Sequence, residues 1–126
     1  MITSAYEIPN LRFSLPAYGN VARHRFVQIK YDNEDGGAYD GSGVQAHGGQ
    51  QVIGVSMNQA ANGEVLEIAD GLVIVEAGAP ITGGSFVESD SEGRAIPTNG
   101  FSGAFAMTGA AAAGEFITVK LYSVTL

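Results

Sequence analysis

Residues 111–124, AAAGEFITVKLYSV, decide the fold class, because they contain the clearest strand pattern in the chain. From Glu115 to Val124, one series of side chains alternates with a second, more apolar one: Phe116, Thr118, Lys120 and Tyr122 against Ile117, Val119, Leu121 and Ser123. A two-residue alternation is the periodicity of a β-strand that buries one face. Residues 115–124 are therefore expected to form a strand.

The start of this segment has a second copy earlier in the chain. Residues 60–68, AANGEVLEI, align without a gap with residues 111–119, AAAGEFITV, and each copy follows a glycine in a short apolar stretch, Gly54 or Gly103. Each copy is typical of an alanine-rich connection followed by Gly-Glu and a strand. A duplicated strand–loop–strand unit is what a small β-barrel or β-sandwich would use twice.

Further short strands are expected outward from the repeat. Their ranges are 25–31, 52–57, 65–68, 72–76, 85–88, 95–96 and 101–107. Asp70-Gly71 is interpreted as a hairpin turn. Six glycines are expected to form structural turns: Gly54, Gly63, Gly71, Gly93, Gly103 and Gly114.

Composition supports the same class. The chain has 126 residues, no cysteine and 18 glycines, and 45% of it is hydrophobic, which is enough to build a core. We expect an all-β, small single-domain β-barrel or β-sandwich-like fold of short strands. The expected compact domain spans residues 23–126 and contains a long loop at 32–51. A single helical turn at 109–113 is an alternative that would not change the class.

Residues 1–22 are expected to form an extended N-terminal arm. Pro9 and Pro16 disfavour a helix or a central strand. Most of the large side chains around them are too apolar for a solvated tail, so we expect contacts with a neighbouring subunit or with the protein's own body. The expected contact residues are Tyr6, Ile8, Leu11, Arg12, Phe13, Leu15 and Tyr18. On this interpretation, removing residues 1–20 leaves a folded domain but weakens association.

Charge argues against nucleic-acid binding, because the net charge is −7. Residues 1–30 carry four basic side chains and Glu7, a local +3, whereas residues 31–126 carry twelve acidic and two basic side chains, a local −10. A basic start on an acidic body suggests that the two parts meet different surroundings, and ordinary surface scatter is the alternative.

No metal site, cofactor or catalytic centre is expected. The carboxylates of Asp32, Glu34, Asp35 and Asp40 do not fit a calcium loop, because Gly36 and Gly43 occupy ligand positions 5 and 12. His24 and His47 lack a ligand pattern, and no G-x-S-x-G elbow occurs. Thr108 stands where a biotin- or lipoate-carrying hairpin would need lysine. The chain is thus expected not to be an enzyme.

No signal peptide or apolar run of about 20 residues is found, so a soluble protein made in the cytoplasm is expected.

The order of glycine-punctuated motifs resembles the phage capsid cement (decoration) family. These motifs are Ile53-Gly54-Val55, Gly63-Glu64, residues 71–75 and 77–81, Gly84, Val87–Asp90, Gly93-Arg94-Ala95, Gly103 and residues 113–121. The resemblance implies a structural protein on the exterior of a tailed-phage capsid that stabilises contacts between major capsid proteins. It places the arm against the shell or a sister subunit. A homotrimer is favoured, with a dimer or monomer as alternatives.

Two other classes remain open at this point. One is another virion component, such as a tail or baseplate β-domain. The other is a small ligand-binding β-barrel.

Overall fold

The computed structural model describes residues 5–32, 38–48, 52–98 and 103–122, and it describes residues 8–10, 31–32 and 38–40 by their backbone alone. The described residues form strands and no helix, so the all-β prediction is confirmed, and none of them forms a helix that could cross a bilayer. The strands are β1 (Ile8–Pro16), β2 (Phe26–Asp32), β3 (Ala38–Gln45), β4 (Gly54–Ser56), β5 (Val65–Glu76), β6 (Phe86–Ser89), β7 (Ala95–Pro97), β8 (Ala104–Ala106) and β9 (Phe116–Leu121).

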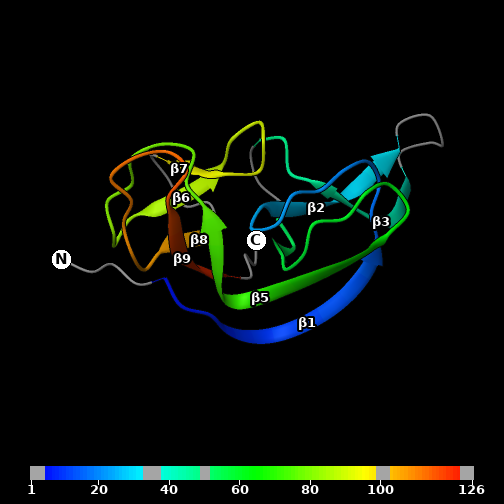
Figure 1. Ribbon diagram of the computed structural model, residues 1–126, viewed down its shortest axis with the longest axis horizontal. Coiled ribbons are helices and arrows are strands. Elements are labelled where there is room, and N and C mark those ends of the chain that lie inside the picture. The colour runs from blue at the N-terminus through cyan, green and yellow to red at the C-terminus, as the bar shows by residue number, and fades with distance from the viewer. Residues whose placement is uncertain (1–4, 33–37, 49–51, 99–102, 123–126) are drawn as a thin grey trace.

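All strand pairs are antiparallel, and the order in the sheet is β3-β2-β4-β5-β9-β8-β6-β7, with β1 paired to β5 off this path. Strand β5 is the centre of this arrangement. Its residues 65–72 pair with β1, residues 68–69 pair with β4, and residues 72–76 pair with β9. In Figure 1, β1 runs alongside β5 for most of its length.

The N-terminal and C-terminal halves of strand β5 bury opposite faces of the strand. Leu66 and Ile68 belong to one hydrophobic cluster, and Val73 and Val75 belong to another. Because side chains alternate along a strand, even-numbered residues face one side and odd-numbered residues the other. Strand β5 therefore serves two separate layers of the core.

The interpretation of Asp70-Gly71 as a hairpin turn is wrong. Gly71 lies inside β5 with a φ of 106°, opposite Pro9 of β1, where a bulge shifts the register between Pro9 and Leu11. The left-handed backbone at this glycine alters the course of the strand without reversing it. The chain thus continues from one half of the molecule into the other.

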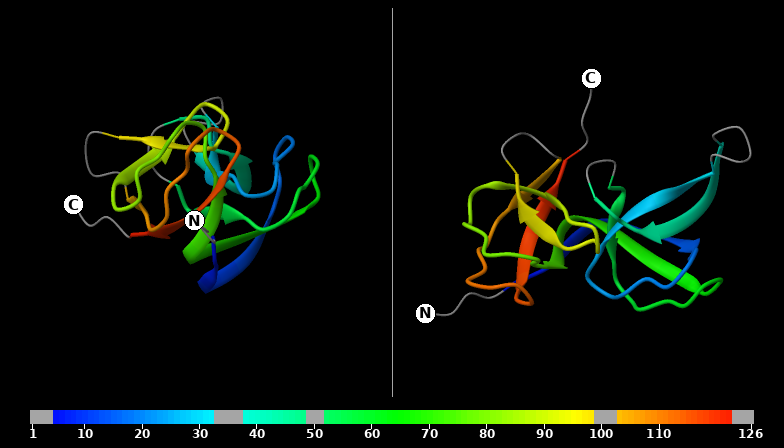
Figure 2. Two further views of the ribbon diagram at one scale, coloured as in Figure 1. Left: turned by 60° about the vertical axis from the view of Figure 1, so that its left-hand side comes forward. Right: turned by 90° about the horizontal axis from the view of Figure 1, so that it is seen from above.

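Each half is a small five-stranded barrel. In the first barrel, β1, β5, β4, β2 and β3 pair in sequence, and a bridge between Ala17 and Gly43 links β3 back to the end of β1. The second barrel is built in the same way from β5, β9, β8, β6 and β7. A bridge between Ala77 and Ala95 links β7 back to the end of β5. Figure 2 (right) shows the two barrels side by side, joined through β5.

The Gly-Glu part of the sequence repeat makes equivalent hydrogen bonds in the two barrels. The backbone N–H of Gly63 donates to Ala17 O, and that of Gly114 donates to Ala77 O, both at 2.8 Å. The side chains of Glu64 and Glu115 each accept from the backbone of an alanine, Ala61 or Ala111. The two Gly-Glu pairs are therefore structural equivalents.

The repeat extends further than the sequence match. Phe26-Val27 pairs with β4 as Phe86-Val87 pairs with β8, so strands β1–β4 have counterparts in the second barrel. In these registers Gly54 corresponds to Ala104, not to Gly103, because Gly54 lies opposite Val27 and Ala104 lies opposite Val87. Ala60 bridges to Val21 as Ala110 bridges to Ile81, so Ala60 corresponds to Ala110 and the alignment without a gap is wrong up to this alanine.

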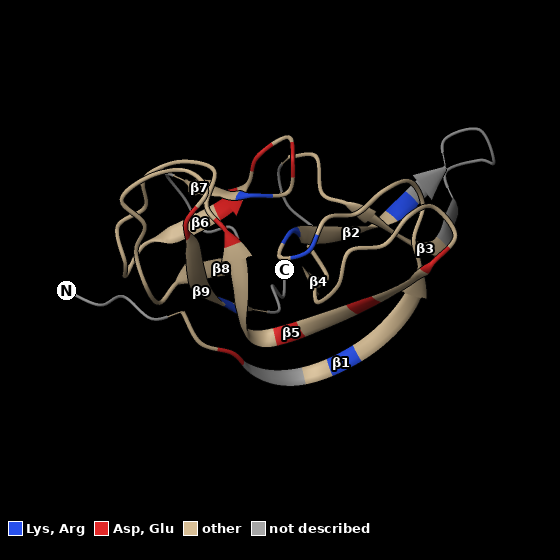
Figure 3. Cartoon of the chain, in the orientation of Figure 1, with Lys and Arg blue, Asp and Glu red and all other residues tan. Residues whose placement is uncertain are grey.

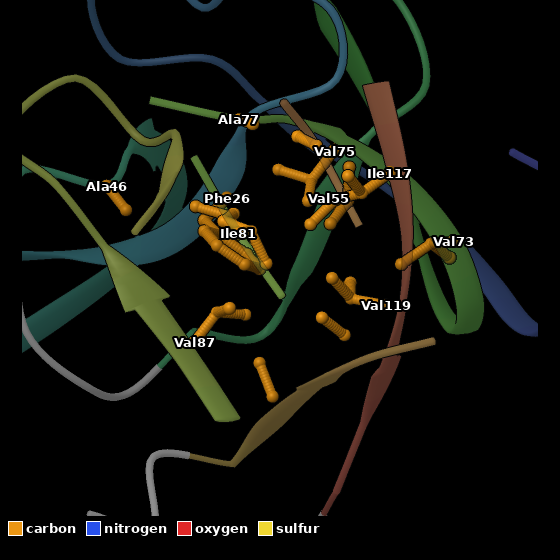
Figure 4. Packing of buried hydrophobic residues seen from close by; sticks show 14 of the residues in the cluster. Phe26, Ala46, Val55, Val73, Val75, Ala77, Ile81, Val87, Ile117 and Val119 are labelled. Carbon is orange, nitrogen blue, oxygen red and sulfur yellow. The ribbon is translucent and has the colours of Figure 1, made fainter. Parts of the chain in front are cut away.

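The two barrels share a core. Figure 4 shows Phe26 and Val55 of the first barrel packed with side chains of the second, such as Ile81 and Val119. A second cluster lies inside the first barrel and contains Ala17, Val21, Val27, Ala60, Leu66 and Ile68. Because the larger cluster crosses from one barrel to the other, the barrels are not independent folding units.

The predicted boundary between an arm at 1–22 and a domain at 23–126 is wrong for the described residues. Residues 8–16 are strand β1, and Ala17 and Val21 lie in the core of the first barrel. Prolines are tolerated there because Pro9 lies at a bulge and Pro16 ends the strand. The expected loop at 32–51 is also wrong in part, since β3 occupies residues 38–45.

Candidate interaction surface

The seven expected contact residues fall into three groups. Phe13 and Leu15 pack against the core of the first barrel, so they are used internally. Tyr6, Leu11 and Tyr18 are exposed, at 41%, 54% and 55% of their full surface. Ile8 lies opposite Leu72, and its side chain is outside the described residues, while exposed Arg12 lies 3.3 Å from the Glu67 carboxylate.

Residues 5–7, called the strap here, lie across the outer face of the second barrel. The backbone N–H of Tyr6 donates to Thr118 Oγ1 at 2.7 Å, and the same hydroxyl donates to Tyr6 O at 2.8 Å. Glu7 Oε1 accepts from the backbone N–H of Ile74 at 3.2 Å. The strap therefore connects the first strand of the first barrel to β5 and β9 of the second.

Exposed apolar side chains gather around the strap. Phe116 lies two residues before Thr118 on β9 and is exposed, and the backbone N–H of Met107, also exposed, donates to Thr118 O at 2.8 Å. Together with Tyr6, these residues expose large side chains next to one buried threonine. Large exposed apolar patches on soluble proteins mark interaction sites.

The basic residues of the N-terminal region are spread over the body rather than grouped (Figure 3). Arg12 pairs with Glu67, and the Arg25 guanidinium lies 3.5 Å from the Glu76 carboxylate. Lys30 lies over the ring of Tyr18, 4.6 Å from its centre. The inference that a basic start and an acidic body meet different surroundings is therefore weakened, because the body's own carboxylates pair with two of the four basic residues.

Arg25 belongs to an ionic cluster at the joint between the barrels. Glu76 lies between Arg25 and Arg94, at 3.5 and 3.9 Å. Arg94 also contacts the carboxylates of Asp90 at 3.1 Å and Glu92 at 2.8 Å. These side chains are mostly buried apart from that of Glu92, so removing one partner would leave an opposite charge at the joint without its counterion.

Of the six glycines expected at turns, Gly54 lies inside β4 and Gly71 inside β5, so the turn prediction is wrong for these two. Left-handed φ angles occur at Gly63 (85°), Gly71 (106°), Gly93 (78°), Gly103 (88°) and Gly114 (94°). Gly54 is required for a different reason, since a Cβ there would collide with the Ile68 side chain and lie 2.8 Å from Ala69 O.

The described residues contain no group of three or more His, Asp, Glu or Cys side chains placed to hold a metal ion. Glu34 and Asp35 of the expected acidic loop lie outside the described residues. Asp32 and Asp40 lie on paired strands β2 and β3, and their side chains are not described.

The surface described above is that of an all-β protein whose exposed features are apolar side chains and paired charges. The phage cement protein family matches the chain over residues 7–121, and the chain belongs to this family. No curated protein matches it. Among solved structures, the N base of the head fiber gp8.5 of bacteriophage phi29 is similar, with a TM-score of 0.70 and 19% identity over 92% of this chain and 97% of that one.

Family membership confirms the resemblance noted in the sequence and defines the kind of protein. The chain is a structural, capsid-associated decoration protein of a phage. The solved head-fiber base has the same fold at low identity, so it supports the arrangement of the strands.

Proposed function

We propose that this protein binds the exterior of a tailed-phage head at junctions between major capsid proteins and stabilises those junctions without enzymatic activity. The observation that carries the proposal is the family match over both barrels, combined with large apolar side chains exposed on the segment before and after β1. A clamp of this kind needs exposed contact area on a rigid body, and no concave site is required.

We propose that the exposed members of the original contact set, Tyr6, Leu11, Arg12 and Tyr18, contact the shell. Leu11 in β1 and Tyr18 just after it are both more than half exposed, although other residues of the same segment pack into the first barrel. Burying one such side chain at an interface is worth about 1.5–3 kcal/mol. Phe13 and Leu15 are excluded from the contact because they already pack in the core.

We further propose that the protein acts as a homo-oligomer, with a trimer favoured. Several copies joined together engage several capsid subunits at once, and this raises the effective affinity without a deep pocket. The acidic net charge keeps free copies from associating nonspecifically, so the oligomer needs a specific interface.

The test is co-sedimentation of the purified protein with empty heads that lack it. Leu11→Ser and Tyr18→Ser are each expected to weaken head binding about tenfold, because each removes the burial energy of one large side chain. Met107→Ser tests the rival apolar patch around Thr118, since Met107 is also exposed but lies after β8 in the second barrel. Sedimentation equilibrium of the free protein measures the oligomeric state.

Failure of the wild-type protein to bind heads would contradict the capsid role and favour a tail or baseplate component. Normal binding by Leu11→Ser and Tyr18→Ser, with loss in Met107→Ser, would move the contact to the face around Thr118. A monomer in solution and on heads would overturn the oligomer.

A further inference from the structure

His24 has an unusual backbone for its residue type. Its φ is 62°, and it is the one residue other than glycine with a positive φ in the part of the chain that the structure describes. Histidine tolerates this left-handed region better than most residues, but glycine is the common choice. A strained residue at a defined position is a reason to ask what its side chain does.

The second barrel shows what the backbone alone requires at this position. The backbone N–H of His24 donates to Ser56 O at 3.0 Å, and the equivalent N–H of Gly84 donates to Ala106 O at 2.8 Å. Gly84 has a φ of 88°. The second barrel thus uses glycine where the first has histidine, so the imidazole is not needed for the turn itself.

The imidazole instead reaches the second barrel. Its ring contacts Phe116 of β9 edge to face, with centroids 5.1 Å apart, and the backbone carbonyl of His24 accepts from the N–H of Glu76 at 2.9 Å. The buried Nδ1 of His24 has no hydrogen-bond partner among the described residues. His24 therefore joins the barrels through a neutral, apolar contact as well as a backbone bond.

We propose that His24 is a pH-sensitive clasp, which holds the two barrels together when its imidazole is neutral and loosens their joint when the imidazole is protonated. Protonation would place a positive charge on this partly buried ring, whose Nδ1 has no hydrogen-bond partner among the described residues, and burying a charge is costly. The proposal goes beyond capsid binding and does not depend on it.

Burial of the imidazole, together with the charges around it, determines the direction of the effect. Burial and then the charge of Arg23 lower the pKa of His24, whereas Glu7 of the strap, the backbone of Ile74 and Glu76 of β5 oppose this. Arg25, next in the chain, is also positive, and β9 presents the ring of Phe116. The folded protein binds the proton less readily than the unfolded chain, so stability is complete above the usual pKa of 6.5 and decreases as pH falls below it.

The test compares the full-length wild type with His24→Gly and His24→Asn. Both replacements tolerate the left-handed backbone and neither titrates. Between about pH 7.5 and 5, the unfolding equilibrium constant of the wild type is expected to rise about threefold or more relative to either variant. His47→Asn, which removes the other histidine, is expected to follow the wild type.

A second measurement locates the effect at the joint. Acidification should increase amide exchange at Glu76, which donates to His24 O, relative to Ala106, which donates to Ser85 O inside the second barrel. In His24→Gly this ratio should stay constant. Equal pH dependence in wild type and His24→Gly, an imidazole that titrates by NMR at or above its usual pKa, or an unchanged exchange ratio would each overturn the clasp.

Discussion

The two barrels follow one plan of backbone hydrogen bonds but present different surfaces. Gly63 and Gly114 donate to equivalent carbonyls, while the outer face of β1 carries exposed Arg12 and Ser14 where the same face of β5 carries half-buried Leu72 and Ile74. The strap contacts the second barrel at Ile74 and Thr118. The Gly-Glu turns are therefore alike in the two barrels, whereas these surface positions differ.

The hairpins that follow the first strand of each barrel differ as well. In the second barrel, the Asp90 side chain accepts from the backbone N–H groups of Glu92 and Arg94, at 2.8 and 2.9 Å, and this closes a tight turn between β6 and β7. In the first barrel, β2 and β3 are longer and pair out to Asp32 and Ala38. The β2–β3 hairpin is therefore longer than its counterpart β6–β7, and this difference makes the repeat asymmetric.

The largest effect is expected from deleting residues 1–20. This deletion removes β1, exposes the edge of β5 and opens the cluster around Leu66 and Ile68, so we expect no cooperative folded state. Deleting residues 1–7 keeps β1 and removes the strap, and the expected cost is about 1–3 kcal/mol from the lost hydrogen bonds to Thr118 and Ile74. Far-UV circular dichroism and thermal melts measure both, and a sigmoidal wild-type-like melt of the longer deletion would restore the independent arm.

Gly54 and Ala104 test whether equivalent positions tolerate the same side chain. Gly54→Ala is expected to destabilise the protein by about 1–3 kcal/mol, because its methyl group would press on Ile68 and Ala69 O. Ala104→Gly removes a buried methyl group and is expected to cost about 1 kcal/mol. Urea denaturation measures both, and an equal or larger loss for Ala104→Gly would contradict the close approach at Gly54.

Gly63 and Gly114 test the shared turn. A Cβ at either position meets no atom within 4 Å, so the cost of Gly63→Val or Gly114→Val is backbone strain, about 1–3 kcal/mol each. Ala112→Val, in the exposed connection before Gly114, is the control and should change stability by about 0.5 kcal/mol or less. Thermal melts in which both glycine variants match the wild type would remove the argument from the repeat.

The smallest effect is expected at the Arg12–Glu67 pair, which lies on the first barrel's outer face. Both side chains are about half exposed, so Arg12→Ala should cost about 0.2–1 kcal/mol and the difference should shrink in high salt. Denaturant curves at low and high salt measure it. A salt-independent loss would indicate that the arginine contributes packing instead of charge.

The sequence predicts strands best where side chains alternate. Residues 116–121 show the pattern and form β9, with Ile117 and Val119 buried. Thr118 is buried as well, because the strap covers it, and no local pattern could show a contact with a residue more than a hundred positions away. The sequence repeat could also be recognised from the sequence, because the same turn occurs in both barrels and requires Gly-Glu each time.

Strands β1 and β3 escaped the sequence pattern for two physical reasons. Prolines in β1 suggested an arm, yet they lie at a bulge and at the strand end, where a missing donor costs little. In β3, Gly43 looks like a loop residue, but a Cβ there would lie 3.0 Å from the Leu66 side chain, so close packing requires glycine. The unusual position of His24 became clear only by comparison with the equivalent Gly84 of the second barrel. Aligning the sequence with itself at a spacing of 60 residues would have paired these two residues.

Strand β5 is both the last strand of the first barrel and the first strand of the second. A chain built this way lengthens by four strands for each added barrel, because every new barrel begins with a strand that already exists. The nine described strands are what two such barrels need, and β1 and β9 are the first and the last of them, each belonging to one barrel alone. Consequently, the natural place to extend this architecture is beyond β9, where a continued strand would become the first strand of a third barrel.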